Sequence, residues 1–174
     1  MYEAFFGLNC KPFADVPDRD FLVKTKQHLN GLDLLRQTLA DPGKLTVVTG
    51  EVGSGKTTLV KALLQQLGDE VSVCRITNVH PSMRDLSHWV LAGFGYRPPG
   101  TTKPALDQEL ARFLTAEARL GRRCLLVIDE AQNLGAWALE ELLGLLGASG
   151  GERALHVLLV GAPTLRDRLS AAAP

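Results

Sequence analysis

Residues 45–58 read LTVVTGEVGSGKTT, and this stretch decides the fold of the chain. Its opening residues, LTVVT, are mostly apolar and β-branched, which predicts a buried strand. From Gly50 to Thr57 the sequence matches the P-loop pattern Gly-x-x-x-x-Gly-Lys-Thr. Apolar residues at helical spacing from Leu59 to Leu67 then predict an amphipathic helix. A strand, a glycine-rich loop and a helix in this order are the context in which such a loop binds phosphate.

Each residue type in this loop has a physical reason. Glycines allow backbone conformations that a Cβ would forbid, so successive N–H groups can turn toward a phosphate. Lys56 adds a positive charge for the β- and γ-phosphates, which also makes it a catalytic candidate, and the Thr57 hydroxyl can ligate Mg²⁺. The positive end of the following helix faces the same anion. The predicted nucleotide-binding residues are Gly50, Glu51, Val52, Gly53, Ser54, Gly55, Lys56, Thr57 and Thr58.

The composition is that of an ordinary globular domain. The 174 residues are 45% hydrophobic and 22% charged, and 19 basic residues balance 19 acidic ones. This balance gives no electrostatic argument for a nucleic-acid partner. Cys74 and Cys124 fall in predicted strands and are expected to be small buried side chains in a reducing cytosol. Without a basic leader or an apolar run of about 20 residues, we expect a soluble cytoplasmic protein.

The apolar patterns predict four strands that alternate with helices. Such alternation indicates an α/β fold with a mainly parallel sheet. The third strand is wholly apolar, which predicts a central place in the sheet. The expected strands cover residues 45–49, 71–76, 124–128 and 155–160, and the expected helices cover 28–40, 56–67, 86–90, 104–120 and 136–146 and a last one from 163. Residues 1–21 hold four of the six phenylalanines and are expected either to pack on the core or to cover a base.

The second part of the predicted site follows the third strand. The apolar run LLVI ends at Asp129 and Glu130. Ligands of open α/β sheets bind at the carboxyl ends of the strands, so Asp129 is expected to hold Mg²⁺ opposite Thr57. Glu130 is expected to orient and deprotonate the attacking water. Because switch GTPases lack this adjacent glutamate, the pair indicates an ATPase.

A polar residue near the end of the fourth strand often contacts the γ-phosphate in such enzymes. Here the strand is followed by Gly161-Ala162-Pro163-Thr164, so only Thr164 offers a hydroxyl. Asn133, after the acidic pair, is the other candidate. Either residue is equally consistent with a role as a helix cap.

Beyond the P-loop, the chain resembles the ExeA/GspA-type secretion ATPases of the AAA superfamily. The resemblance rests on the opening MYEAFFGLNCKPFADVPDRDFL, on TGEVGSGKTTL, on Thr77-Asn78, on LLVIDEAQNL and on LLVGAPTLRDRL, in that order. It implies a three-layer P-loop NTPase fold of the ASCE/AAA type. Residues 1–43 would form an aromatic segment and a helix, and residues 44–174 the nucleotide-binding core. The domain is expected to be incomplete, stopping before a fifth strand and a helical lid.

The resemblance also implies a function. Such proteins bind and hydrolyse ATP with Mg²⁺ and energise or regulate the assembly of a type II secretion machine. They are expected to form homo-oligomers when full-length and to work with an inner-membrane partner at the cytoplasmic face. Two departures from the family pattern affect γ-phosphate sensing: Ala162 stands where the family usually has glutamine, and Gly147-Ala148-Ser149 stand where it usually has asparagine.

Two other functions remain open at this point. One is a DNA-transposition ATPase of the TniB-like kind, which shares the AAA core but would favour a basic stripe. The other is a nucleotide-dependent interaction scaffold with little turnover. We expect the isolated chain to hydrolyse ATP slowly, because an arginine finger in this family would lie beyond the fourth strand.

Overall fold

The computed structural model describes residues 26–39, 45–77, 79, 85–97, 102–148 and 155–172. These residues form a four-stranded parallel sheet with the order β1-β4-β3-β2. The strands are β1 (Leu45–Thr49), β2 (Val71–Ile76), β3 (Arg123–Ile128) and β4 (Leu155–Gly161). The aromatic segment at residues 1–21 lies outside the described residues.

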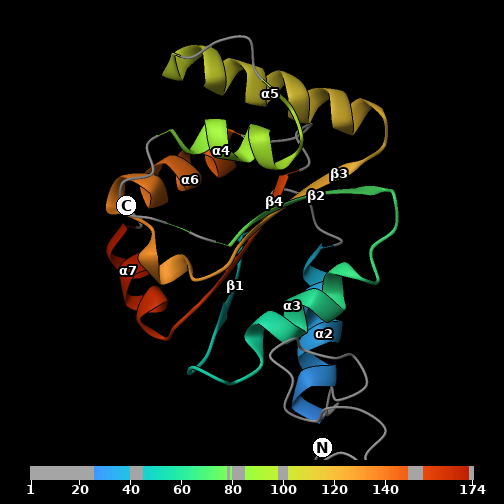
Figure 1. Cartoon of the computed structure of the whole chain (residues 1–174), viewed down its shortest axis with the longest axis vertical. Helices are drawn as coiled ribbons and strands as arrows, with labels where there is room; N and C mark the ends of the chain where they lie inside the picture. The colour runs from blue at the N-terminus through green and yellow to red at the C-terminus, as the bar shows by residue number, and fades with distance from the viewer. Residues whose placement is uncertain are drawn as a thin grey trace, which may run out of the picture.

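Helices cover both faces of this sheet. They are α2 (Lys26–Leu39), α3 (Lys56–Leu64), α4 (Leu86–Gly93), α5 (Lys103–Arg119), the short 3-10 helix η2 (Ala131–Asn133), α6 (Ala136–Ala148) and α7 (Thr164–Ala172). Figure 1 shows α2 and α3 on one side of the sheet, with α4, α5 and α6 on the other. The predicted three-layer α/β architecture is therefore confirmed.

Alternating side chains of the strands supply the two cores. On one face, Leu126, Ile128 and Leu159 pack with residues of α4, α5, α6 and α7. On the other face, Val127 and Val160 pack with α2 and α3. This alternation follows from the two-residue repeat of a strand. Both faces are covered, and the buried parts of β3 from Cys124 to Ile128 and of β4 from Val157 to Val160 are accordingly apolar.

Two sequence predictions differ from the structure in detail. The strand at residues 45–49 was predicted to be buried, yet β1 is only partly covered and Val47 is 38% exposed. The reason is position: among the described strands β1 pairs with β4 alone, whereas the central β3 pairs on both sides. The helix after the glycine-rich loop was predicted to reach Leu67, but α3 ends at Leu64. Leu67 still packs in the same core, which explains its apolar character.

The two described cysteines are buried, as predicted. Cys74 lies on β2 and Cys124 on the neighbouring β3, and both contribute to the core on the α5 side of the sheet. Burial disfavours the thiolate and raises the pKa of each thiol to about 12. At neutral pH both thiols are therefore inert core side chains.

Candidate nucleotide-binding site

The glycine-rich loop leaves the sheet beside the end of β4. The Gly50 N–H donates to the Gly161 carbonyl at 3.2 Å, which fixes the start of the loop to that strand. Gly53 and Gly55 have φ angles of 80° and 82°, a region in which a side chain is strained. The loop therefore needs glycine at both positions to turn from β1 into α3.

Lys56, the first residue of α3, folds back over the loop. Its ammonium group donates to the carbonyl oxygens of Gly50 at 2.7 Å and Glu51 at 2.8 Å. The side chain is thus held at the centre of the loop by two backbone acceptors. A phosphate bound to the loop would meet this ammonium group and the positive N-terminus of α3 together.

Asp129, directly after β3, links the loop to the centre of the sheet. Its backbone N–H donates to the Ile76 carbonyl at 2.9 Å, and the residue is only 6% exposed. The Thr57 hydroxyl donates to Asp129 Oδ2 at 3.2 Å. The guanidinium of Arg75, on β2, donates to the same oxygen at 3.3 Å. The structure thus brings together the two residues that were predicted to hold Mg²⁺, and it adds a cation beside them.

Glu130 occupies an unusual backbone conformation next to Asp129. Its φ of 53° is left-handed, which costs a non-glycine residue about 1–3 kcal/mol and is typical of functional sites. Its backbone N–H donates to Asp129 Oδ1 at 3.1 Å. Its carboxylate accepts a hydrogen bond from Gln132 Nε2 at 2.5 Å. The predicted base is therefore held by a side chain that the sequence analysis did not single out.

The other predicted residues lie around this centre to different degrees. Glu51 and Val52 are on the exposed outer side of the loop, where Val52 is 97% exposed, while Thr58 lies inside α3. Both candidates for γ-phosphate contact are exposed: Thr164 begins α7, and Asn133 ends η2. Both residues therefore remain candidates for contact with the γ-phosphate.

Three residues near the site were missed by the sequence analysis. Arg75 is the only charged residue in the β2 sequence VSVCRI, which was a usable signal. Gln132 lies inside the quoted stretch LLVIDEAQNL but has no local pattern that reveals its partners. His28, on α2, donates from Nε2 to the Ser54 carbonyl at 3.3 Å, and only the fold brings it to the loop.

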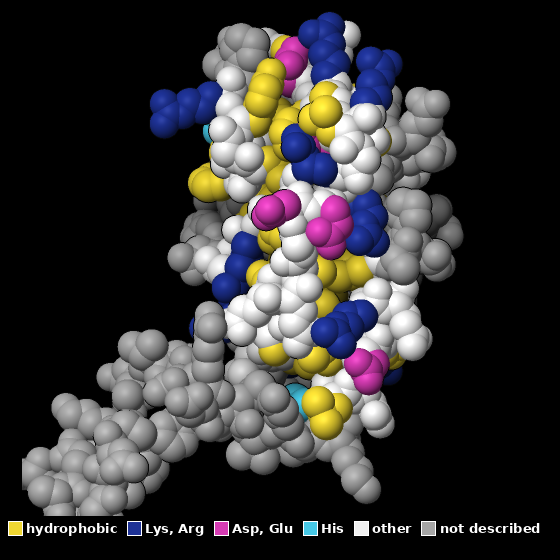
Figure 2. All heavy atoms as spheres, turned by 90° about the vertical axis from the view of Figure 1, so that its right-hand side faces the viewer, with side chains coloured by type: hydrophobic (Ala, Val, Ile, Leu, Met, Phe, Trp, Pro, Cys, Tyr) yellow, Lys and Arg dark blue, Asp and Glu magenta, His cyan; other side chains and the backbone are white. Residues whose placement is uncertain are grey.

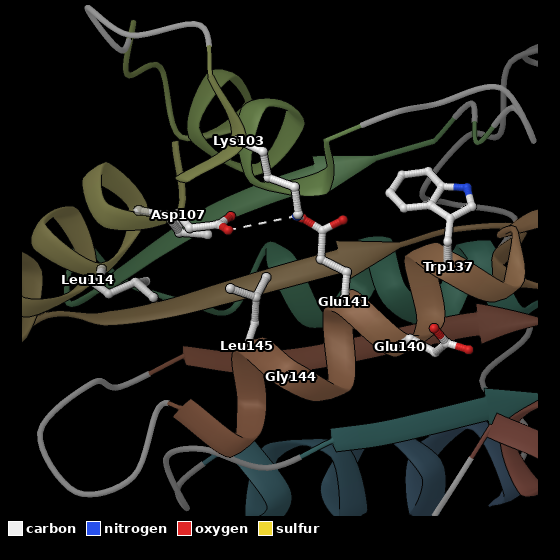
Figure 3. Close-up of a pocket in the computed structure, with 10 residues that line it drawn as sticks. Lys103, Asp107, Leu114, Trp137, Glu140, Glu141, Gly144 and Leu145 are labelled. Atoms are coloured by element: carbon white, nitrogen blue, oxygen red, sulfur yellow. Dashed lines mark hydrogen bonds and ion pairs between the residues drawn. The ribbon is translucent and has the colours of Figure 1, made fainter. Parts of the chain in front are cut away.

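A separate hollow of about 610 Å³ lies between α5 and α6. Figure 3 shows Lys103 reaching from α5 toward Asp107 and Glu141, with Leu114 and Leu145 below. The Lys103 ammonium is 2.5 Å from Glu141 and 3.8 Å from Asp107. None of the residues that line this hollow belongs to the glycine-rich loop or to the acidic pair.

Surface charge is mixed over the part of the chain that the structure describes. Figure 2 shows Lys and Arg side chains spread along one face, with acidic side chains among them. Several of the basic residues are already in ion pairs. The pairs are Arg36–Asp33, Arg75–Asp129, Lys103–Asp107, Lys103–Glu141, Arg112–Glu109 and Arg122–Glu117.

Comparison with known proteins identifies the family of this chain. Residues 40–169 match the AAA domain family. The chain belongs to this family. It is also 36% identical over 171 residues to general secretion pathway protein A of Aeromonas hydrophila, an alignment that covers 97% of this chain and 31% of that protein. The resemblance to the ExeA/GspA-type proteins is therefore confirmed, and the chain spans about a third of the length of this relative.

Solved structures of other proteins share the fold. The ADP form of the Aeropyrum pernix ORC2 protein superposes with a TM-score of 0.64 at 17% identity, covering 91% of this chain and 47% of that one. A Walker-type ATPase of Pyrococcus abyssi gives a TM-score of 0.58 at 18% identity, covering 92% of this chain and 52% of that one. At these identities the likeness shows the fold alone. Across the described ranges, no helix has the length and apolar character needed to span a membrane.

Proposed function

We propose that this AAA domain binds ATP with Mg²⁺ and hydrolyses it. The observation that carries the proposal is the contact between Thr57, on the helix after the glycine-rich loop, and Asp129, at the end of β3. These residues are 72 positions apart in sequence, and a strand-terminal carboxylate beside a P-loop threonine is the arrangement used by P-loop nucleoside triphosphatases. The Aeropyrum pernix ORC2 protein, whose ADP form has been solved, shares this fold, which is consistent with the proposal.

The donor set at this position fits Mg²⁺. The Thr57 hydroxyl and an Asp129 carboxylate oxygen are hard oxygen ligands 3.2 Å apart, and Mg²⁺ typically takes one or two protein oxygens together with phosphate oxygens and water. When bound, the ion would supply positive charge that offsets the charge developing on the phosphates during transfer. Thr57 and Asp129 are the residues that would hold it.

Within this proposal, Glu130 takes the proton of the attacking water. Its carboxylate is adjacent to Asp129, and Gln132 contacts its Oε2 atom. A carboxylate has two acceptor oxygens, so Oε1 can accept a proton while Oε2 keeps its hydrogen bond. Lys56 supplies the positive charge for the β- and γ-phosphates.

We further propose that the domain serves a type II secretion-like machine. The support is the relationship to general secretion pathway protein A, of which this chain covers 31%. The full-length protein would act as a homo-oligomer at the cytoplasmic face of the inner membrane, with a membrane protein as its partner. ATP hydrolysis would energise or regulate assembly of that machine.

Neither alternative function has comparable support. A transposition ATPase would be favoured by a basic surface for the phosphates of DNA, whereas the described basic residues are dispersed and often paired with acids. A scaffold with little turnover does not require a glutamate in a strained conformation beside the Mg²⁺ ligand.

Titration calorimetry with Mg²⁺ and ATP tests the binding site. Lys56→Ala removes the loop's ammonium group and is expected to abolish measurable binding, while Lys61→Ala, on the same helix but outside the loop, should bind as wild type does. ATP at about 100 times its Kd should stabilise wild type and Lys61→Ala by about 2.7 kcal/mol. Unchanged affinity in Lys56→Ala would overturn the assignment of the loop.

Phosphate release tests the chemistry separately. Glu130→Gln keeps the shape of the side chain but removes the base, so it should bind ATP and fail to hydrolyse it. Turnover at the wild-type rate in this variant would show that another group activates the water.

A further inference from the structure

The Gln132 side chain bridges the proposed base and the end of β4. Its amide nitrogen donates to Glu130 Oε2 at 2.5 Å, and its amide oxygen accepts the Ala162 N–H at 2.9 Å. These two partners determine the orientation of the amide, because a carboxylate only accepts and a backbone N–H only donates. Both polar atoms of the Gln132 amide therefore have a hydrogen-bond partner.

The end of β4 is shaped to receive this amide. A Cβ added to Gly161 would stand 2.5 Å from Gln132 Oε1 and 3.3 Å from the Gln132 backbone nitrogen. Glycine at this position is what allows the close approach. Ala162 contributes only its backbone N–H, so the polar group beside the end of β4 comes from Gln132 rather than from residue 162.

A third contact joins the same residue to α7. Arg168 donates from its guanidinium to the Gln132 carbonyl. The helix itself is anchored in the core by Leu165, which is fully buried. Gln132 therefore contacts the proposed base, the end of β4 and α7, and β4 also holds the start of the glycine-rich loop through Gly161.

We propose that Gln132 is the positioning residue for Glu130, and that it ties the orientation of this base to the end of β4. The inference rests on the proposed function. The amide hydrogen bond holds Oε2 in place and leaves Oε1 directed to accept the proton of water. Without it, Glu130 keeps its carboxylate but loses its fixed orientation, and a base that is misplaced by a fraction of an ångström loses rate rather than substrate affinity.

Three variants separate positioning from folding. Gln132→Ala removes both side-chain hydrogen bonds. Gln132→Glu keeps an acceptor for the Ala162 N–H but turns a carboxylate toward Glu130, so only the bond to the base is lost. Gln108→Ala, on α5, makes the same chemical change at an exposed position.

The measurements are single-turnover ATP hydrolysis, KM, ATP affinity and Tm of the whole protein, with hydrogen exchange at the Ala162 amide. We expect kcat to fall on the order of 10–100-fold in both Gln132 variants, with ATP affinity and KM within about twofold of wild type. The Ala162 amide should exchange faster in Gln132→Ala and stay protected in Gln132→Glu. Gln108→Ala should match wild type throughout.

The outcomes distinguish this inference from the proposed function. A purely structural role predicts that Gln132→Glu, which preserves the link to β4, keeps wild-type kcat and Tm while Gln132→Ala loses both. That result, or an unchanged or raised kcat in both variants of an active protein, would overturn the positioning role alone. A wild-type protein that binds no ATP, or binds it without hydrolysis, would overturn the proposed function and this inference with it.

Discussion

At the scale of single residues, the most informative contact is the one between Arg75 and Asp129. The guanidinium lies 3.3 Å from the oxygen that also accepts the Thr57 hydroxyl. Arg75 Nε is buried and has no hydrogen-bond partner among the described residues, an arrangement that costs about 1–3 kcal/mol. This cost is set against the ion pair with Asp129, so the charge of Arg75 beside the proposed Mg²⁺ ligand is the property that we test.

Arg75→Gln should therefore increase the apparent affinity for Mg²⁺. Removing a positive charge next to Asp129 favours binding of a divalent cation there. For partly solvated groups, the binding free energy should improve by about 1 kcal/mol, which is roughly fivefold in affinity. The measurement is the Mg²⁺ concentration that gives half of the ATP-dependent increase in Tm. Arg112→Gln, on the exposed side of α5, is the control. An unchanged or higher Mg²⁺ requirement in Arg75→Gln would show that the arginine does not compete with the ion.

At the scale of elements, position in the sheet decides how much each strand contributes to stability. Leu126, in the middle of β3, is fully buried between layers, whereas Val47 on β1 is 38% exposed. Both residues lie in apolar runs, so their sequences alone predict similar burial. Their burial differs because β3 pairs with a strand on each side, whereas β1 pairs only with β4 among the described strands.

Leu126→Ala should lower the free energy of unfolding by about 3–4 kcal/mol, because it opens a cavity in a packed core. Val47→Ala should lower it by about 1 kcal/mol or less, since its side chain already contacts water. Urea denaturation of the two variants under the same conditions gives both values. Equal losses would mean that β1 is as deeply buried as β3 in the folded protein.

The end of α5 is joined to the sheet by a charged cluster. Glu117 is only 7% exposed and accepts two hydrogen bonds from Arg122, at 2.6 and 2.8 Å, and one from Ser72 on β2. The hydrogen bonds from Arg122, with a further contribution from Ser72, hold the pKa of Glu117 below its usual value. Folding therefore favours the ionised carboxylate.

This shift predicts a pH-dependent contribution to stability. A carboxyl with a lowered pKa in the folded state stabilises the fold above its ordinary pKa, and the contribution is lost as pH falls through the lowered value. Glu117→Gln should thus cost about 1–2 kcal/mol at pH 7, and the difference from wild type should shrink below about pH 4. Urea unfolding at a series of pH values tests this. A difference that stays constant across the series would exclude ionisation as its source.

At the scale of the whole molecule, the site is assembled at one end of three adjacent strands. The ends of β1, β4 and β3 carry the glycine-rich loop, the Ala162 N–H and the acidic pair, respectively. Two of the described arginines at this end are engaged within the chain: Arg75 with Asp129 and Arg168 with the Gln132 carbonyl. The resemblance to the ExeA/GspA-type proteins leads us to expect that a further positive charge on the γ-phosphate in the transition state comes from another subunit.

We therefore expect the single-turnover rate of ATP hydrolysis to rise with protein concentration. An arginine supplied by a neighbouring subunit is typically worth about 10³–10⁵ in rate, so dilute protein should bind ATP but hydrolyse it slowly. The rate is measured over a wide range of protein concentrations at saturating Mg²⁺ and ATP. Fast hydrolysis that does not depend on concentration would show that the required charge is supplied within one chain.

By itself the sequence predicts the elements and the residues of the loop. Strand and helix positions follow from local periodicity, and the roles proposed for Lys56, Thr57, Asp129 and Glu130 follow from motifs that are contiguous in the chain. The central place of β3 also follows, because the unbroken apolar run from Cys124 to Ile128 is typical of a strand buried on both faces. These features are encoded by residues that are close together in sequence.

The strand order and the long-range contacts of the site are determined by the tertiary structure. The place of β4 between β1 and β3, the exposure of β1, and the partners of Arg75 and Gln132 depend on residues that are far apart in the chain. Gln132 meets Ala162 across 30 positions because parallel strands end at the same edge of a sheet and glycine at 161 leaves room for the amide. Local sequence carries no signal for such a contact, since its free energy comes from two groups that become neighbours only when the sheet has formed.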